Sequence, residues 1–156
     1  MILNLTLFQP EIAQNMGTVI RLCACFGIPF NVIEPCGFPF SGKALKRSAM
    51  DYASFAEVKR YVSFRSYHED MMQKSKKNRL ILFSTKGRCA LWDFQFRKND
   101  HLIFGNESSG VPAYVSEKVD EQVYIPMFGR GRSLNIAVSA GIGLGEATRQ
   151  LVYRKK

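Results

Sequence analysis

Short apolar runs alternate with stretches of helical periodicity along the whole chain. Each run is continuously apolar rather than alternately apolar and polar, which is typical of strands covered on both faces. Alternating strands and helices build a mainly parallel sheet with helices on both of its faces. The sequence therefore predicts an α/β fold with strands at residues 2–8, 30–35, 79–85, 101–105 and 121–126, and a short strand within residues 56–64.

The expected helices carry start and stop signals. Asn15 is a candidate cap for the first helix, and Gly27 is a natural stop for it. Pro112 suits the first turn of a later helix. We expect the last helix to run from near Ser133 to about Arg154, and two further helices at residues 43–52 and 66–77.

The chain length and charge restrict the class of protein. The 156 residues predict a single domain over residues 1–156, and 46% apolar residues are enough for a real core. The formal net charge of +9 favours a polyanionic partner, RNA or DNA before all others. The alternative is that the excess charge serves solubility alone.

The cysteines and histidines favour neither disulfides nor zinc. The four cysteines form no CxxC pair, and the two histidines, His68 and His101, belong to no ligand motif and are expected at the surface or at a strand end. The N-terminus has no basic secretory region, and no apolar run approaches the length of a membrane span. We therefore expect a reduced cytoplasmic protein without a metal site.

Three polar, glycine-bearing loops follow predicted strands. They read QNMGTVIR, FGNESSGVP and IPMFGRGRSLN. Ligands of open α/β sheets bind beyond the carboxyl ends of the strands. A dinucleotide fingerprint is excluded because the first turn offers only Gly17, and a Walker phosphate loop is excluded because no GK[ST] occurs. The loops together predict a ligand site of another kind.

The three loops resemble the three motifs of the SPOUT superfamily of RNA methyltransferases, and they occur in the same order. The residues Asn15–Gly17–Arg21 match the first motif, FGNESSG the second, and IPM followed by a glycine loop and SLN the third. Residues 33–52 are similar to those of the small single-domain members that methylate the ribose 2′-hydroxyl of the tRNA wobble nucleotide. The third motif departs from that subgroup, because Leu134 and Ala137 stand where those members often have Met and Ser.

The resemblance implies a sheet whose C-terminal part is tied in a deep trefoil knot, with S-adenosylmethionine held in the knotted loops. It implies Arg21, Glu107 and Asn15 as catalytic residues. Glu107 serves equally well as a loop carboxylate that binds backbone N–H groups, and Asn15 as a structural cap. The implied cofactor residues are Phe83, Gly105, Ile125, Met127, Ser133 and Leu134, and Ser133 has a plain helix cap as its alternative role.

Small residues recur every four positions in the last helix, at Ala137, Gly141 and Gly145. Glycine within a helix costs about 1 kcal/mol relative to alanine, so close packing is expected to offset that cost. The family suggests a homodimer through this face. The alternative is packing against the chain's own sheet.

Basic residues are the candidates for binding tRNA. They are Lys43, Lys46, Arg47, Lys86, Arg88, Arg130 and Arg132. The expected function is methylation of the ribose at position 34 of the tRNA anticodon. The alternatives are the same chemistry at another tRNA or rRNA site, and a catalytically silent RNA-binding dimer.

Overall fold

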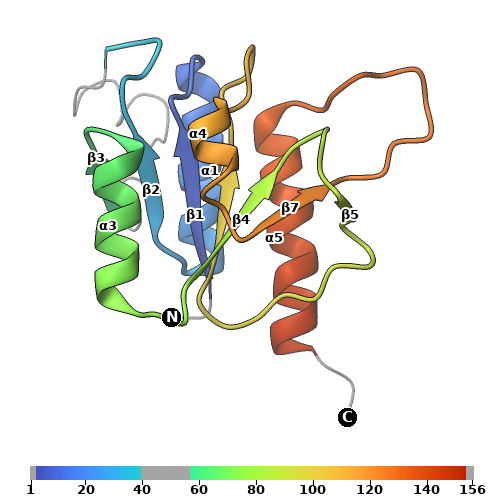
Figure 1. Cartoon of the computed structure of the whole chain (residues 1–156). Helices are drawn as coiled ribbons and strands as arrows, with labels where there is room; N and C mark the ends of the chain where they lie inside the picture. The colour runs from blue at the N-terminus through green and yellow to red at the C-terminus, as the bar shows by residue number, and fades with distance from the viewer. Residues whose placement is uncertain (1–2, 40–56, 154–156) are drawn as a thin grey trace.

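The computed structural model describes residues 3–39 and 57–153. Its helices and strands follow the predicted alternation (Figure 1). The elements are, in chain order, β1 (Leu3–Phe8), α1 (Ala13–Phe26), β2 (Phe30–Ile33), β3 (Val58–Tyr61), α3 (Phe64–Lys74), β4 (Arg79–Phe83), β5 (Cys89–Ala90), β6 (Asp100–Phe104), α4 (Ala113–Ser116), β7 (Glu121–Tyr124) and α5 (Ile136–Val152).

The described strands form one seven-stranded sheet in the order β3-β2-β1-β6-β4-β7-β5. Every strand pair is parallel, with Leu5 opposite Leu102 and Leu82 opposite Ile103 in the centre. The chain first builds outward from β1 through β2 to β3, and then adds the remaining strands on the other side of β1. Such a reversal leaves a crevice at the carboxyl ends of the central strands, where ligands of open α/β sheets bind.

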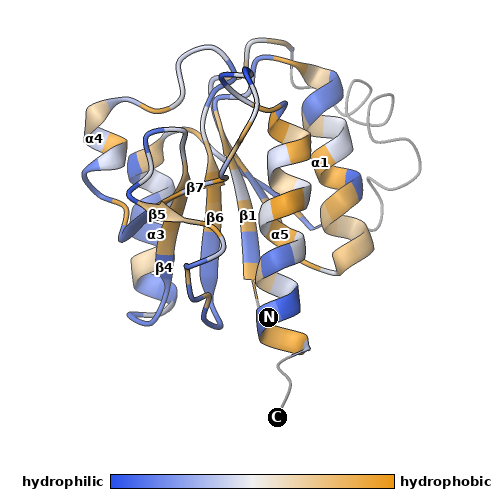
Figure 2. Ribbon diagram, turned by 90° about the vertical axis from the view of Figure 1, so that its right-hand side faces the viewer, coloured by the Kyte–Doolittle hydropathy of each residue, from blue (hydrophilic) through white to orange (hydrophobic). Residues whose placement is uncertain are grey.

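Helices cover both faces of the sheet. Viewed along its edge, α1 and α5 lie together on one side, and α3 and α4 lie on the other (Figure 2). The α1–α5 side packs residues such as Met16, Ile20 and Leu144 against the sheet, and the α3 side packs Phe64 and Met71. The predicted α/β class with helices on both faces is therefore confirmed. None of the described helices has the length and apolarity needed to cross a bilayer.

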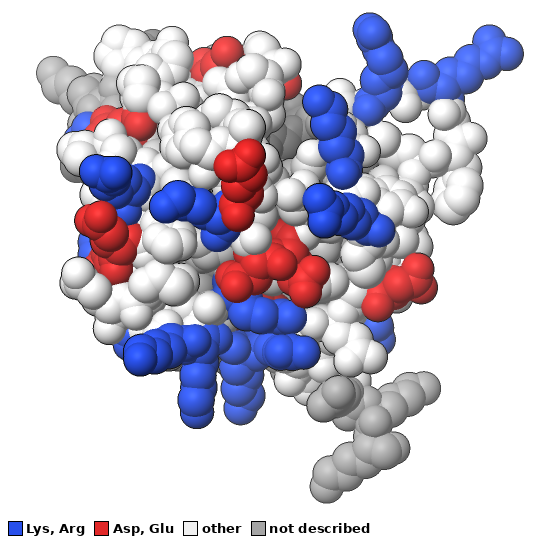
Figure 3. Space-filling view, viewed as in Figure 1, with Lys and Arg blue, Asp and Glu red and all other residues white. Residues whose placement is uncertain are grey.

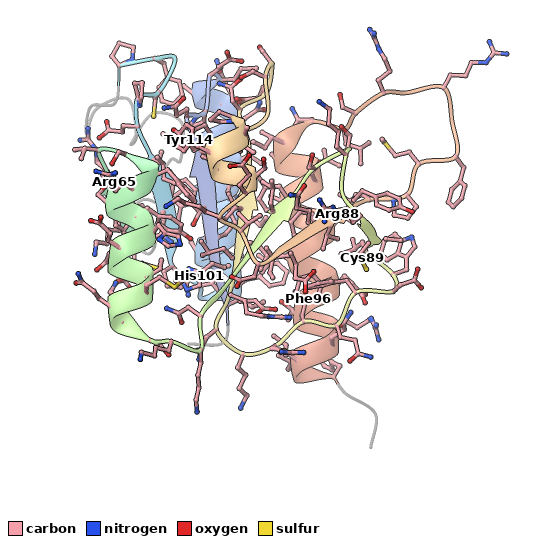
Figure 4. All side chains as sticks on the ribbon, in the orientation of Figure 1. Arg65, Arg88, Cys89, Phe96, His101 and Tyr114 are labelled. Carbon is pink, nitrogen blue, oxygen red and sulfur yellow. The ribbon has the colours of Figure 1, made fainter. Side chains whose placement is uncertain are left out.

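A chain of buried polar side chains joins the sheet to α3. Asn31 Nδ2 donates to Thr6 Oγ1 at 3.3 Å, and Thr6 Oγ1 donates to the Tyr67 hydroxyl at 3.0 Å. That hydroxyl lies 3.3 Å from His101 Nδ1, and Asn4 Nδ2 lies 3.5 Å from His101 Nε2. His101 lies between α3 and the central strands (Figure 4), is 3% exposed, and is not the surface residue that one reading of the sequence allowed.

The predicted ends of the first and last helices need correction. Asn15 lies inside α1 and does not cap it, because the N-cap is Ile12, which makes no side-chain cap. Ser133 does not begin the last helix, because Asn135 caps α5 through its side-chain oxygen. Gly27 does end α1 in the left-handed conformation, as expected.

Two further elements fall outside the prediction or the described structure. The two-residue strand β5, which pairs with β7, is too short to be predicted from an apolar run in the sequence. The helix expected at residues 43–52 lies outside the described residues.

The small residues of α5 face two different surroundings. A Cβ on Gly143 would lie 2.7 Å from the Phe83 ring, so this glycine lets α5 approach the sheet. A Cβ on Gly141 or Gly145 would meet nothing within 4 Å. Packing against the chain's own sheet therefore explains Gly143 but not Gly141 or Gly145.

Candidate active site

The loops that follow β1, β4, β6 and β7 surround a cavity of about 650 Å³ at the carboxyl edge of the sheet. This cavity brings all six expected cofactor residues together. Asn15, Glu107, Lys86 and Arg132 from the other predicted sets also line it. The six expected cofactor residues are Phe83, Gly105, Ile125, Met127, Ser133 and Leu134.

Glu107 closes the amino end of α1 from a loop distant in sequence. Its Oε2 accepts the Glu11 N–H at 2.8 Å, and its Oε1 accepts the Ile12 N–H at 3.3 Å. A carboxylate at this position satisfies the N–H groups of the N-cap residue and of the residue before it, and it also suits the positive end of the helix dipole. Since α1 has no side-chain cap of its own, Glu107 takes that role.

Asn15 connects the first loop to the other two. Its Nδ2 donates to Glu107 Oε1 at 3.1 Å, and its Oδ1 accepts from Asn135 Nδ2 at 2.9 Å. Asn135 in turn accepts the N–H groups of Ala137 and Val138 at the start of α5. A single hydrogen-bonded chain therefore ties the three motif loops together, which is the convergence that the sequence motifs predict.

The loop between β6 and α4 is held by Asn106, a residue that the sequence reasoning missed. Its Oδ1 accepts the N–H groups of Ser108 and Ser109, both at 3.0 Å, and its Nδ2 donates to the Gln9 carbonyl at 2.8 Å. Asparagine commonly organises tight turns in this way, so an Asn shortly before a Gly was the available signal. Hydrogen bonds from the neighbouring Ser108 hold the pKa of the Glu11 carboxylate below its ordinary value.

Gly105 is required by the same loop. A Cβ on Gly105 would lie 2.6 Å from the carbonyl carbon of Gly110, a separation that real Cβ atoms do not show. Gly110 itself has a φ of 67°. The close approach expected of Gly105 is therefore to the backbone of its own loop.

In the described structure, another part of the cavity wall, formed by the segment after β7, is exposed rather than held by internal hydrogen bonds. Residues 127–134 are all exposed, and they form the segment that swings out beyond β7 in Figure 1. Met127 and Leu134 line the cavity while remaining 37% and 39% exposed. In Figure 3 this segment carries blue side chains and no red ones.

Several predicted residues lie away from the cavity. Arg21 is exposed on α1 and does not line it. Arg130 is exposed in the segment after β7, and Arg88 lines a separate small depression beside β7. Lys43, Lys46 and Arg47 lie outside the described residues. In the part of the chain that is described, no group of His, Cys, Asp and Glu side chains is arranged to hold a metal ion.

The fold and this site define a methyltransferase of the SPOUT type, and the chain belongs to the SpoU rRNA methylase family, which it matches over residues 2–145. Among curated proteins it is 45% identical to a tRNA (cytidine(34)-2′-O)-methyltransferase of Beijerinckia indica subsp. indica, over 94% of this chain and 91% of the relative.

Solved structures agree with this assignment. One is a structure from work on the 2-OH methylation of C/U34 on tRNA. It superposes on this chain with a TM-score of 0.90, at 40% identity and over 97% of both chains. Another is the SpoU methyltransferase AviRb of Streptomyces viridochromogenes in complex with AdoMet. It has a TM-score of 0.85 at 26% identity and covers 99% of this chain and 59% of that one.

The residues present fit S-adenosylmethionine. The cavity volume lies within the range of about 300–1,000 Å³ that is usual for small-molecule sites. Ile125, Met127 and Leu134 offer apolar surface for an adenine ring, and the exposed sides of the last two are surfaces that a ligand would cover. Lys86 and Arg132 supply positive charge at the same cavity.

Proposed function

We propose that this protein transfers a methyl group from S-adenosylmethionine to the ribose 2′-hydroxyl of nucleotide 34 in tRNA. The observation that carries the proposal is the hydrogen-bonded chain Glu107–Asn15–Asn135, which joins all three motif loops around one cavity. Relatives whose names give this activity match the chain over nearly its full length. The net charge of +9 suits an RNA substrate.

In this reaction, the residues that line the cavity bind the methyl donor and orient it toward the ribose. The bound donor supplies a methyl group on a positively charged sulfur, open to attack by a ribose oxygen. Ile125, Met127 and Leu134 would hold the apolar part of the donor, and Lys86 and Arg132 would face the carboxylate of the donor or the phosphates of the RNA. Alignment of the reacting atoms at about 3 Å is a main source of rate enhancement in such a transfer.

Glu107 and Asn15 act as positioning residues in this proposal. The Glu107 carboxylate already accepts two backbone N–H groups and the Asn15 amide. A carboxylate engaged in this way is suited to fixing the loops rather than to taking the proton of the ribose hydroxyl. No histidine is among the residues that line the cavity in the described structure, so no imidazole base is available there.

We further propose that the protein acts as a homodimer through α1 and α5. These two helices lie side by side (Figure 2), and the open positions at Gly141 and Gly145 leave room for another helix. Arg21 is exposed on α1, so a two-fold arrangement would present it to the partner's cavity. There its planar guanidinium would hold the RNA beside the reacting hydroxyl by two parallel hydrogen bonds.

We also propose that residues 1–156 act as one domain in the cytoplasm, with the C-terminal part tied in a trefoil knot. All described strands belong to a single sheet. The knot is supported by the family to which the chain belongs. In such a knot α5 would be held against an earlier segment, as it is here by Gln150, whose Nε2 donates to the Phe94 carbonyl at 2.8 Å and whose Oε1 accepts the Phe96 N–H at 2.9 Å.

Mapping of methylated nucleosides tests the proposed reaction. Transfer RNA from cells with and without the protein is digested and analysed by mass spectrometry. We expect the 2′-O-methyl group at position 34 to disappear with the protein and to return with the wild-type chain. If the methyl group is lost at another tRNA or rRNA position instead, that position is the substrate. If no methyl group is lost and calorimetry shows no binding of S-adenosylmethionine, the protein is a catalytically silent RNA-binding protein.

Replacing Arg21 by lysine tests its assigned role. Lysine keeps the charge but loses the planar fork, so we expect turnover to fall about 100-fold or more while donor affinity is kept. Near-normal turnover of the Arg21→Lys variant would remove Arg21 from the mechanism.

The Gly141→Leu variant tests the dimer, which we expect to dissociate in a sedimentation experiment.

A further inference from the structure

The most exposed large apolar side chain in the described structure is Phe128, which is 96% exposed. It stands in the segment of residues 127–134, where every residue is exposed. A cavity-lining residue, Met127, directly precedes it. An aromatic ring left almost wholly in solvent, one residue from a ligand cavity, is placed to be covered by what binds there.

The charges around this ring select the kind of partner. Arg130 and Arg132 follow it within the same segment, and residues 125–135 contain no Asp or Glu. Arg132 and Lys86 also line the cavity. Aromatic rings beside arginines bind unpaired nucleic-acid bases, because the ring stacks on the base and the guanidinium groups pair with the phosphates.

The geometry points to Phe128 as a stacking residue for an unpaired base next to the nucleotide that is methylated. This inference rests on the proposed function, because it places the methylated ribose at the cavity that Met127 lines. One residue spans about 3.3–3.6 Å of extended chain, so the backbone that carries the Phe128 ring lies one residue's length from the cavity wall.

The surroundings of the segment leave room for such a base. A Cβ on Gly129 or Gly131 would meet nothing within 4 Å. An RNA loop whose bases are unpaired can place one against the ring, whereas a continuous duplex keeps its bases stacked within the helix. Phe128 would therefore make the enzyme select a looped strand such as an anticodon.

A set of substitutions tests this role on an anticodon stem-loop RNA. We expect Phe128→Ala and Phe128→Leu to lower kcat/KM about 10- to 100-fold, mainly through KM, since stacking one base on an aromatic ring is a contribution of that size. Phe128→Tyr should stay within about threefold of wild type because it keeps the ring. Val62→Ala, which truncates another exposed side chain (80% exposed) before α3, is the control and should change nothing.

A direct signal separates this inference from the proposed function. Trp92 is the only tryptophan of the chain, so a Trp92→Phe, Phe128→Trp variant carries one reporter at position 128. We expect its fluorescence to be quenched by the stem-loop and not by an RNA duplex of equal length. Quenching without methylation by any form of the protein would refute the proposed function and keep the stacking role.

Three results would overturn the inference. The first is wild-type methylation together with an unquenched reporter. The second is a Phe128→Leu variant as active as wild type, because leucine is apolar but cannot stack. The third is loss of self-association by Phe128→Ala in sedimentation without RNA, which would make a second copy of the chain the partner of this ring.

Discussion

The two walls of the cavity differ in how far internal hydrogen bonds fix them. One wall, the loops at residues 9–15 and 105–110, is fixed by hydrogen bonds that converge on Glu107, Asn106 and Asn15. The other, residues 127–134, is exposed throughout and carries an aromatic ring and two arginines. We call them the fixed wall and the open wall.

The difference indicates what each wall has to do. A site that aligns reacting atoms needs a rigid reference, and internal hydrogen bonds provide it before any ligand arrives. A site that admits a cofactor and a large RNA also needs a part that can be covered later. Met127 and Leu134 in the open wall are apolar and partly exposed, so ligands would complete their burial.

Gly105→Ala should break the fixed wall most severely. The new Cβ would lie 2.6 Å from the Gly110 carbonyl carbon, so the loop must shift. We expect a loss of about 1–3 kcal/mol in the free energy of unfolding from overpacking, and about 100-fold lower turnover from displaced site residues. Urea unfolding and initial rates measure both. A variant with wild-type rates would show that this loop does not set the geometry of the site.

Low pH should lower the free energy of unfolding through a region apart from both walls, the buried hydrogen-bonded side chains around His101. Burial lowers the pKa of His101 to about 4 from an ordinary value of 6.5, with Lys74 lowering it and Asp70 raising it to lesser extents. The unfolded chain therefore binds the proton more readily. Stability present above pH 6.5 should fall by about 3 kcal/mol as the pH drops to 4.

Chemical denaturation at several pH values checks this, with His101→Gln as the comparison. The variant should lose this part of the pH dependence. An identical pH profile for both proteins would place the acid sensitivity elsewhere, and measurements on the two walls should be made above pH 6.5 in either case.

Glu107→Gln should weaken the fixed wall without a steric clash. The amide has one acceptor oxygen where the carboxylate has two, so either the Glu11 N–H or both the Ile12 N–H and the Asn15 amide lose their acceptor. We expect a loss of about 2 kcal/mol in the free energy of unfolding. Glu69→Gln, on the exposed face of α3, is the matched control and should have little effect. Equal losses for both would contradict the capping role.

Gly131→Ala should have the smallest effect, and it matches Gly105→Ala in chemistry. A Cβ on Gly131 meets nothing within 4 Å. We therefore expect a change in unfolding free energy within about 0.5 kcal/mol. A loss as large as that of Gly105→Ala would mean that the open wall is packed in solution, and the contrast between the walls would fail.

Local sequence patterns predicted most of the fold. Continuous apolar runs located β1, β2, β4 and β6, because a strand buried on both faces needs them. They did not reveal β5, whose two residues are too few for a pattern. The start of α1 was misplaced because its amino end is held by Glu107, a residue that only the tertiary fold brings near. The start of α5 was placed slightly early, since Asn135 rather than Ser133 caps it.

The site could be predicted only where residues form motifs. The three motif loops identified the cavity, and the six expected cofactor residues line it, whereas Asn106 acts through a turn that the motif does not specify. Phe128 attracts attention only when its exposure is known. Arg21, which the first motif also marks, lies exposed on α1 outside the cavity, and its role there belongs to the proposed dimer.

Amide hydrogen exchange with and without S-adenosylmethionine tests the contrast between the walls most directly. The account predicts slow exchange at Glu11 and Ile12 in the free protein, because Glu107 already accepts their N–H groups. It predicts fast exchange in residues 127–134 that slows at least about tenfold when the donor binds. Unchanged exchange in residues 127–134 at saturating donor, or no difference between the walls before binding, would contradict it.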